Sequence, residues 1–195
     1  SFIFKSIMII KSKDLLKNLT SDTNFYLLYG SNSGLIEETI NEIIKSDLTQ
    51  KLLSYDENQI LSNDHNFEES ILNKSFFDDG KLIIISRCSD KILGTIQNLI
   101  SKDITEIKII LKADILEKKS KLRNFFEKDD KTICVPFYED NYQSLINIVK
   151  NFFKEKQIKI SPQAMNCIIE RSKGDRINLK NELSKISSFC CNKNS

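Results

Sequence analysis

The chain has 195 residues, of which 40% are hydrophobic and 29% are charged, with 5 glycines and 2 prolines. This composition is that of an ordinary globular protein, excludes collagen-like and disordered classes, and at this length suits one larger and one smaller domain. The formal net charge of +2 is too small to predict nucleic acid or a membrane as the main partner, because such partners are recognised by clustered basic residues.

The five cysteines show no Cys-x-x-Cys spacing, and His65 is the only histidine. A zinc site is therefore not expected, and an odd count that includes three lone cysteines in apolar contexts fits reduced thiols in the cytoplasm. We expect no metal and no cofactor. The run Phe2–Ile10 contains Lys5 and is too short to span a bilayer, so it is expected to be a first strand, not a membrane segment. The chain begins with Ser1 and stops directly after a helical pattern, and we expect the full protein to be longer.

Short apolar runs rich in β-branched or aromatic residues recur along the first two thirds of the chain. Such runs are expected of strands that are buried on both faces of a parallel sheet. They are Phe25–Tyr29, Leu82–Ile85, Ile107–Leu111 and Thr132–Val135, with Lys51–Tyr55 as a further candidate.

Between these runs, apolar residues recur at intervals of three and four, which is typical of one face of a helix. Strands that alternate with such helices predict a three-layer α/β domain with right-handed crossovers. The apolar faces are Leu35, Ile36, Ile40, Ile43 and Ile44; Ile92, Ile96, Leu99 and Ile100; and Leu116, Leu122, Phe125 and Phe126.

After Pro136 the pattern is helical only, and it predicts a small lid domain of three helices. We place an α/β domain at residues 1–139 and the helical domain at residues 140–195. The first helix carries an apolar face from Tyr142 to Phe153, and its two successors have recognisable ends. These are Ser161 and Pro162 at the start of the second helix, Gly174 at its end, and Asp175 as the cap of a third helix with Leu179, Leu183, Ile186 and Cys190 on one side.

The loop that follows the strand at Phe25–Tyr29 contains Gly30, Ser31 and Gly34 and leads into a helix. A glycine loop in this position suggests nucleotide binding. A phosphate-cradling loop, however, needs a longer glycine-bounded turn, a lysine for the terminal phosphates and a serine or threonine for magnesium. No lysine occurs here before Lys45. We therefore expect a degenerate phosphate loop without ATP hydrolysis, with an atypical P-loop enzyme as the alternative.

Two adjacent aromatic residues, Phe76 and Phe77, stand between Ser75 and Asp78, directly before an acidic turn and an apolar strand. Because the strand enters the core, at least one ring can point away from it and serve as a docking plug. From the residues alone, packing in the core at a helix-to-strand corner is the preferred interpretation.

Three groups of motifs follow one another in the chain and together resemble a known family. The resemblance is to the delta subunit of the bacterial DNA polymerase III clamp loader, and it covers nearly the whole chain. The motifs are Tyr26-Leu27-Leu28-Tyr29-Gly30 leading into Leu35-Ile36-Glu37-Glu38; Ser75-Phe76-Phe77 before Lys81-Leu82-Ile83-Ile84-Ile85; and Ile160-Ser161-Pro162-Gln163-Ala164 with Gly174-Asp175 and Asn181-Glu182-Leu183-Ser184-Lys185-Ile186.

The resemblance implies an AAA+-like first domain without ATPase activity, a helical second domain, and a C-terminal collar domain that this chain lacks. Delta subunits bind the ring-shaped sliding clamp through a hydrophobic pair and favour the open ring. The matching residues are Phe76 and Phe77, flanked by Ser75 and Asp78, where many relatives have Leu-Phe. The resemblance thus favours at least one exposed ring, with the sliding clamp and, through the collar, the other loader subunits as partners of a monomeric fragment.

Two further groups of residues allow two interpretations each. The resemblance places Arg176, after Gly174 and Asp175, where active relatives have a nucleotide-sensing arginine, but a helix end followed by a helix cap is the preferred interpretation. The run Lys118–Lys121, with Arg123, could touch DNA phosphates, but a charge run on an amphipathic helix is usually a solvated face. DNA contact is therefore expected to be indirect or weak.

Overall fold

The computed structural model describes residues 15, 23–46, 51–74, 81–102, 104 and 107–191. The chain divides into two compact units, one that ends at Phe137 and one that begins at Tyr138. The strand predicted at Phe2–Ile10 lies outside the described residues.

The first unit is built on a parallel sheet with the strand order β2-β3-β4-β1-β5. All five apolar runs predicted as strands between residues 25 and 135 are confirmed, including the candidate at Lys51–Tyr55. The sheet is buried on both faces because side chains alternate along each strand: Leu27 joins one core, Leu28 the other. The strands are β1 (Phe25–Gly30), β2 (Lys51–Asp56), β3 (Lys81–Ser86), β4 (Ile107–Ala113) and β5 (Thr132–Phe137).

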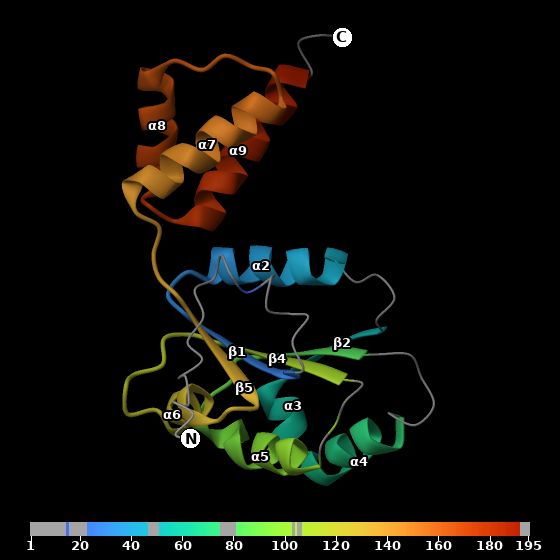
Figure 1. Ribbon diagram of the computed structural model, residues 1–195. Helices are drawn as coiled ribbons and strands as arrows, with labels where there is room; N and C mark the ends of the chain where they lie inside the picture. The colour runs from blue at the N-terminus through green and yellow to red at the C-terminus, as the bar shows by residue number, and fades with distance from the viewer. Residues whose placement is uncertain are drawn as a thin grey trace, which may run out of the picture. The chain divides into compact units, whose positions relative to one another are not determined.

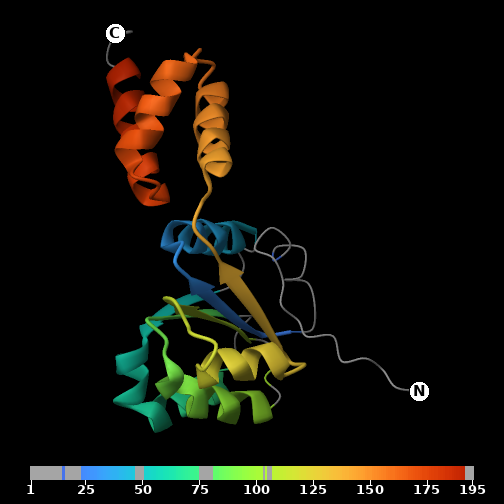
Figure 2. The ribbon, with the colours of Figure 1, turned by 90° about the vertical axis from the view of Figure 1, so that its left-hand side faces the viewer.

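Helices cover both faces of the sheet, as the alternation of strands and helices predicted (Figures 1 and 2). On one face lies α2 (Ser33–Ser46), which contributes Ile36, Ile40 and Ile43 to the core with Leu82 and Ile84 of β3. The larger core on the other face is covered by four helices and a 3₁₀ turn. These are α3 (Glu57–Leu61), α4 (Asp64–Lys74), η2 (Asp90–Ile92), α5 (Leu93–Ser101) and α6 (Lys121–Lys128).

The helices α3 and α4 were missed by the periodicity analysis. Among their described side chains, the buried apolar residues are Ile60 in α3 and Phe67 and Ile71 in α4, so the apolar repeat is weak. A local signal was present at Asp56, whose side chain accepts the N–H of Asn58 at 3.0 Å and begins a capping box. Leu116 was wrongly placed on a helix: α6 begins only at Lys121, and Leu116 packs against the core from the preceding loop.

The second unit is a bundle of α7 (Tyr142–Glu155), α8 (Pro162–Ser172) and α9 (Arg176–Cys191). Its core contains Leu145, Val149, Phe153, Met165, Ile168, Ile169, Leu179 and Leu183. The predicted caps are confirmed, because the Ala164 N–H donates to Ser161 Oγ at 3.2 Å and the Asn178 N–H donates to Asp175 Oδ1 at 2.7 Å. The turn after α8 uses left-handed backbone at Lys173 (φ 53°) as well as at Gly174 (φ 78°).

Cys88 and Cys134 are buried in the first unit. Burial raises the pKa of the Cys134 thiol to about 12 and raises the pKa of Cys88 further, because the thiolate is poorly solvated there. Both side chains therefore act as core residues. Within the described part of the chain, no helix has the length and apolar character needed to cross a bilayer.

The end of β1 depends on a close approach between Gly30 and β5. Gly30 has φ +143°, and a Cβ at this position would lie 2.0 Å from the carbonyl oxygen of Phe137. No other residue type can fill both the space and the backbone conformation without strain. The β1–α2 turn is therefore packed against the last residue of β5.

We expect Gly30→Ala to lower the free energy of unfolding of the first unit by roughly 2 kcal/mol or more, because it combines a strained φ with a steric clash. Gly94→Ala is the matched control: Gly94 lies in α5, and its added Cβ would meet nothing within 4 Å. The control should be neutral or stabilising by about 0.4–1 kcal/mol. Urea denaturation of both variants measures the difference, and equal effects would contradict the close approach.

Candidate functional site

The predicted docking residues Ser75, Phe76, Phe77 and Asp78 lie outside the described residues. The two elements that flank them in the chain, α4 and β3, are described. The segment 75–80 joins the end of α4 at Lys74 to the start of β3 at Lys81, which lies opposite Lys51 of β2 in the sheet. Both residues that flank this segment therefore belong to regular elements of the first unit.

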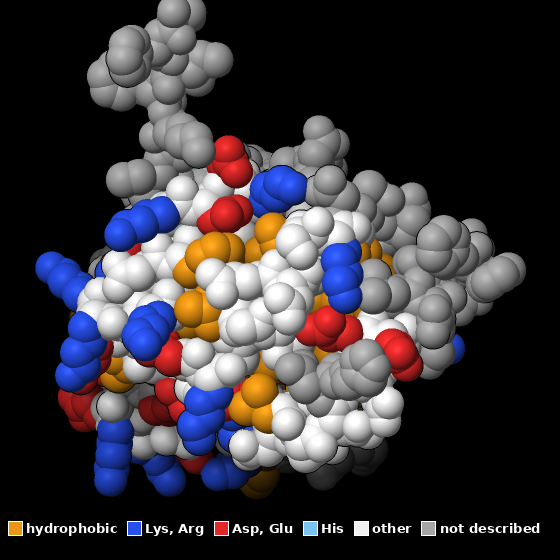
Figure 3. Space-filling view, turned by 90° about the horizontal axis from the view of Figure 1, so that it is seen from below, with side chains coloured by type: hydrophobic (Ala, Val, Ile, Leu, Met, Phe, Trp, Pro, Cys, Tyr) orange, Lys and Arg blue, Asp and Glu red, His pale blue; other side chains and the backbone are white. Residues whose placement is uncertain are grey.

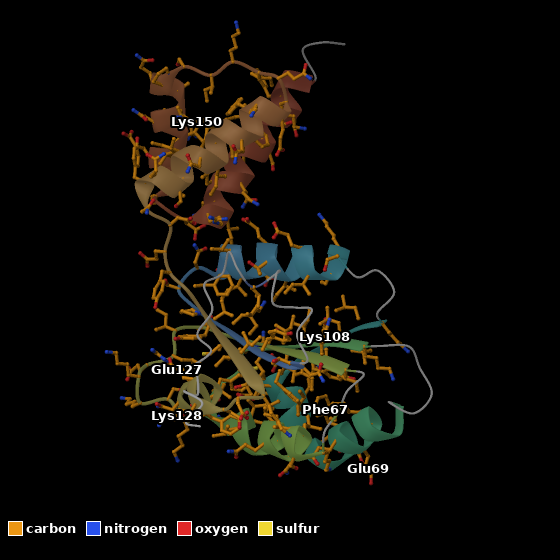
Figure 4. The ribbon with its side chains drawn as sticks, viewed as in Figure 1. Phe67, Glu69, Lys108, Glu127, Lys128 and Lys150 are labelled. Carbon is orange, nitrogen blue, oxygen red and sulfur yellow. The ribbon has the colours of Figure 1, made fainter. Side chains whose placement is uncertain are left out.

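The helix α4 is fixed to the rest of the unit by both apolar and polar contacts. Phe67 is buried and packs edge-to-face on Tyr55 of β2, with ring centroids 5.1 Å apart. Figure 4 shows Phe67 between α4 and the sheet and Glu69 on the opposite side of the helix. Glu68 accepts hydrogen bonds from Asn98 Nδ2 at 3.2 Å and from Lys102 Nζ at 3.1 Å, which tie α4 to α5 and the turn after it. The segment that follows α4 thus starts from a well-anchored helix.

The predicted phosphate loop is a tight turn that the protein closes with its own groups. Only Ser31 and Asn32 separate β1 from α2. The Asn32 N–H donates to the Phe137 carbonyl oxygen at 3.4 Å, and Asn32 Oδ1 caps α2 by accepting the Leu35 N–H at 3.0 Å. Gly34 is buried in the first turn of α2. Gly30, Ser31 and Gly34 therefore do come together, but in a turn that is two residues long.

Several groups around this turn are engaged within the protein itself. A phosphate site needs backbone N–H groups that point at the anion and a lysine that reaches it. Here the Leu35 N–H is taken by Asn32, and the Ile36 N–H donates to the Asn32 carbonyl oxygen at 3.1 Å. Lys112, near the end of the neighbouring strand β4, forms an ion pair with Glu37 of α2. The turn has the position of a phosphate loop, and the N–H groups of Leu35 and Ile36 and the ammonium group of Lys112 are used within the protein.

The N-terminus of α6 is likewise occupied by a carboxylate of the same chain. Asp90 accepts hydrogen bonds from Ser120 Oγ at 2.6 Å, from the Leu122 N–H at 3.0 Å and from the Lys121 N–H at 3.0 Å. The hydrogen bond from Ser120, followed by that from Leu122, lowers the pKa of Asp90. An acidic group at this end of a helix is stabilising, because the helix dipole is positive there.

A second acidic group, Glu57, pins α3 to the turn after β3. Its carboxylate is buried and accepts the Ser89 N–H at 2.6 Å and Ser89 Oγ at 2.9 and 3.0 Å. Next to it, Arg87 forms an ion pair with Asp56. In the described ranges, no three His, Cys, Asp or Glu side chains come together in a way that could hold a metal ion.

Acidic side chains lie next to basic residues in and beside the run Lys118–Lys121. Lys119 pairs with Glu117 at 2.9 Å, and Arg123 is engaged by Glu127 at 2.7 Å while its guanidinium lies 5.2 Å from the centre of the Tyr29 ring. Figure 3 shows Lys and Arg side chains interspersed with Asp and Glu over this face of the first unit. The solvated-face interpretation of the run is the one that these pairings favour.

Arg176 is held inside the helical unit. Its Nε donates to Asp140 Oδ2 at 2.6 Å and its Nη2 donates to Asp140 Oδ1 at 2.7 Å. Only 11% of the Arg176 side chain and 5% of the Asp140 side chain are exposed. This bidentate pair joins the start of α9 to the residue before the α7 cap, and Ser144 Oγ adds a hydrogen bond to Asp140 at 2.8 Å. The guanidinium is thus committed to a structural pair.

Comparison with known proteins agrees with this arrangement. A profile of the family described as DNA polymerase III, delta subunit, matches residues 26–137, more than half of the chain. The chain belongs to this delta-subunit family. A search of curated proteins gave no match.

Solved structures similar to this delta-family chain are AAA+-like, as predicted. The fold resembles the Bacillus subtilis DNA clamp loader delta protein YqeN with a TM-score of 0.53 at 19% identity, over 92% of this chain and 57% of that chain. It also resembles the Thermotoga maritima RuvB Holliday junction branch migration motor (TM-score 0.56, 14% identity, 94% and 64% of the two chains). Domain III of the T. maritima replication initiation protein DnaA is similar as well (TM-score 0.54, 12% identity, 94% and 82%).

Sequence reasoning found the turn at Gly30 and the caps of the helical unit, but it missed Asp90 and Asp140. The two carboxylates act on groups 30 and 36 residues away, Ser120 and Arg176. No local spacing marks such pairs. Of these residues, the sequence analysis singled out only Arg176, because it follows the helix cap Asp175.

For this delta-family chain, we expect Asp140→Ala to lower the stability of the helical unit by about 3–5 kcal/mol, because it leaves a buried guanidinium without its partner. Arg171→Ala is the matched control, since Arg171 is 70% exposed and 3.6 Å from Glu182; it should cost less than about 1 kcal/mol. Amide hydrogen exchange in α7–α9 localises the effect. If the Asp140→Ala/Arg176→Ala double variant loses the sum of the two single losses, the pair is not coupled.

We expect Asp90→Asn to cost about 1 kcal/mol at neutral pH, because the amide keeps the shape of the cap but loses its charge. The folded pKa of Asp90 lies below its unfolded value, so its stabilisation is complete above the unfolded pKa and is lost as the pH falls through the folded pKa. The stability difference between wild type and variant should therefore shrink below about pH 4. Thermal unfolding across this range, with the exposed Asp114→Asn as control, measures it; a difference that stays constant with pH would refute the charged cap.

Proposed function

We propose that this chain is a non-catalytic clamp-loader subunit that binds the sliding clamp through Phe76 and Phe77 and favours opening of the ring during DNA replication. The observation that carries the proposal is the family match over residues 26–137, which includes these two residues. The anchoring of α4 and the start of β3 supports it, because both ends of segment 75–80 join rigid elements.

The energy of such a contact is sufficient for a specific interface. Burial of one large apolar side chain contributes roughly 1.5–3 kcal/mol, so two phenylalanine rings in a pocket can form the central hot spot. Ser75 and Asp78, on either side of the rings, would lie at the polar rim, where contacts contribute little energy but exclude water.

Ring opening in this proposal needs no bond chemistry. A protein that binds the open ring more tightly than the closed ring shifts the equilibrium by the difference between the two affinities. The tight turn at Gly30 supports a role without ATP hydrolysis, since the N–H groups of Asn32, Leu35 and Ile36 are used within the chain. The other loader subunits would be further partners, DNA contact would be indirect or weak, and the place of action would be the cytoplasm.

We expect the Phe76→Ala/Phe77→Ala variant to lose affinity for the sliding clamp of its own organism by roughly 100-fold or more, because about 3 kcal/mol of apolar burial is removed. Surface plasmon resonance with immobilised clamp measures this. Phe189→Ala is the matched control, since Phe189 is an exposed phenylalanine (63%) of the helical unit; its affinity should be that of wild type.

Two outcomes would count against the proposal. Unchanged clamp affinity in the double variant, with an unchanged melting temperature, would remove the docking role of the two rings. Saturable binding of ATP, seen as an ATP-dependent rise in melting temperature, would instead favour an atypical P-loop enzyme.

A further inference from the structure

The two edge strands of the sheet differ in how far they are covered. In β5, at one edge, five of the six residues are buried. In β2, at the other edge, none of the six residues is buried. Within the described part of the chain, β2 pairs only with β3. Among the described residues, no strand pairs with the outward-facing backbone N–H and C=O groups of β2.

This edge lacks the features that usually prevent pairing with another chain. Protective devices at sheet edges are central charges, prolines, bulges and very short strands. The centre of β2 instead carries Leu52, which is 43% exposed, and the exposed Ser54. Charged residues occur only at its ends, as Lys51 and as Asp56, whose carboxylate is paired with Arg87.

A hollow of about 390 Å³ lies beside this edge, between β2, α3 and α4. Asn63, Asn66 and Ser70 contribute amide and hydroxyl groups to its lining, around the aromatic rings of Tyr55 and Phe67. No residue of the lining is charged. Figure 4 shows Phe67 on the side of α4 that faces the sheet. The lining thus combines aromatic rings with neutral polar side chains.

We propose that the free edge of β2 binds an extended segment of a partner protein, which adds one strand to the sheet and places an apolar side chain in the hollow over Tyr55 and Phe67. In strand addition, main-chain hydrogen bonds supply affinity and side-chain pockets supply specificity. The segment is uncharged at its centre, to match the lining, and acidic beside Lys51, which is exposed.

Other occupants match these features less well. Nucleic acid is recognised through lysine and arginine contacts to phosphate, and the lining has neither. A second copy of the chain could pair through its own β2, but its Leu53 and Tyr55 pack against its own core. Leu52, the exposed apolar side chain of β2, alternates with these two residues and therefore lies on the opposite face of its own sheet.

The test uses the peptide acetyl-Asp-Thr-Phe-Thr-Val-Thr-Asp-amide, titrated into the ¹⁵N-labelled chain and followed by NMR. We expect chemical-shift changes confined to β2 and to residues that line the hollow. Ser54→Lys, which places a charge at the centre of the edge, and Asn66→Trp, which fills the hollow, should each weaken binding by roughly tenfold, equivalent to about 1.4 kcal/mol. Gln97→Lys and Gln97→Trp, at an exposed position of α5, are the matched controls and should bind as wild type does.

A charge reversal tests whether the acidic ends of the peptide bind next to Lys51. Lys51→Glu should weaken the Asp-flanked peptide, and a Lys-flanked peptide should restore binding to that variant. Shift changes elsewhere, or equal affinity in Ser54→Lys, Asn66→Trp and the controls, would overturn the proposal, as would a dimer of the chain that Ser54→Lys dissociates. The Phe76→Ala/Phe77→Ala variant should bind the peptide normally, so this test can fail or succeed independently of clamp binding.

Discussion

The close approach of the backbones of Gly30 and Phe137 determines the shape of the turn between β1 and α2. It brings the end of β5 against the turn after β1, where a Cβ would collide with a carbonyl oxygen at 2.0 Å. Because the turn is closed there, α2 begins after only two residues, and Asn32 caps it from inside the protein. In this protein, the turn at the position where α/β sheets commonly bind anions packs against the end of β5.

Several other polar groups in the protein also pair with groups of the same chain. Asp90 neutralises the N-terminus of α6, Glu57 takes the Ser89 N–H and hydroxyl, and Lys112 pairs with Glu37. In the helical unit, Asp140 holds Arg176. Buried polar groups are costly unless they are paired, so the pairs of Glu57 and of Asp140 stabilise the fold. Asp90 and the Lys112–Glu37 pair are more exposed, and they join neighbouring elements at the surface.

The two binding surfaces proposed above involve neighbouring elements of the first unit. Segment 75–80 joins α4, which is anchored by Phe67 and Glu68, to β3. The edge strand β2 lies next to β3 and shares its hollow with α4. Both surfaces would act through buried area and backbone hydrogen bonds, which is consistent with a family member whose proposed task is to hold a partner in one conformation.

The sequence pattern predicted those strands and helix ends that depend on residues close together in the chain. The strands were predictable because burial on both faces requires continuous apolar runs, as at Ile107–Leu111. The starts of α8 and α9 were predictable because Ser161 and Asp175 cap the N–H groups of residues three positions ahead. The short helices α3 and α4 were not, because each buries too few apolar residues to show a repeat.

Only the tertiary structure decided which distant groups meet. Gly30 and Phe137, Asp90 and Ser120, and Asp140 and Arg176 are far apart in the chain, and each pairing depends on the order of strands or the packing of helices. The sequence by itself determined a three-layer α/β unit, a helical unit and the glycine at the turn. Whether that turn was open or closed, and which edge of the sheet was left uncovered, depended on contacts that no local spacing records.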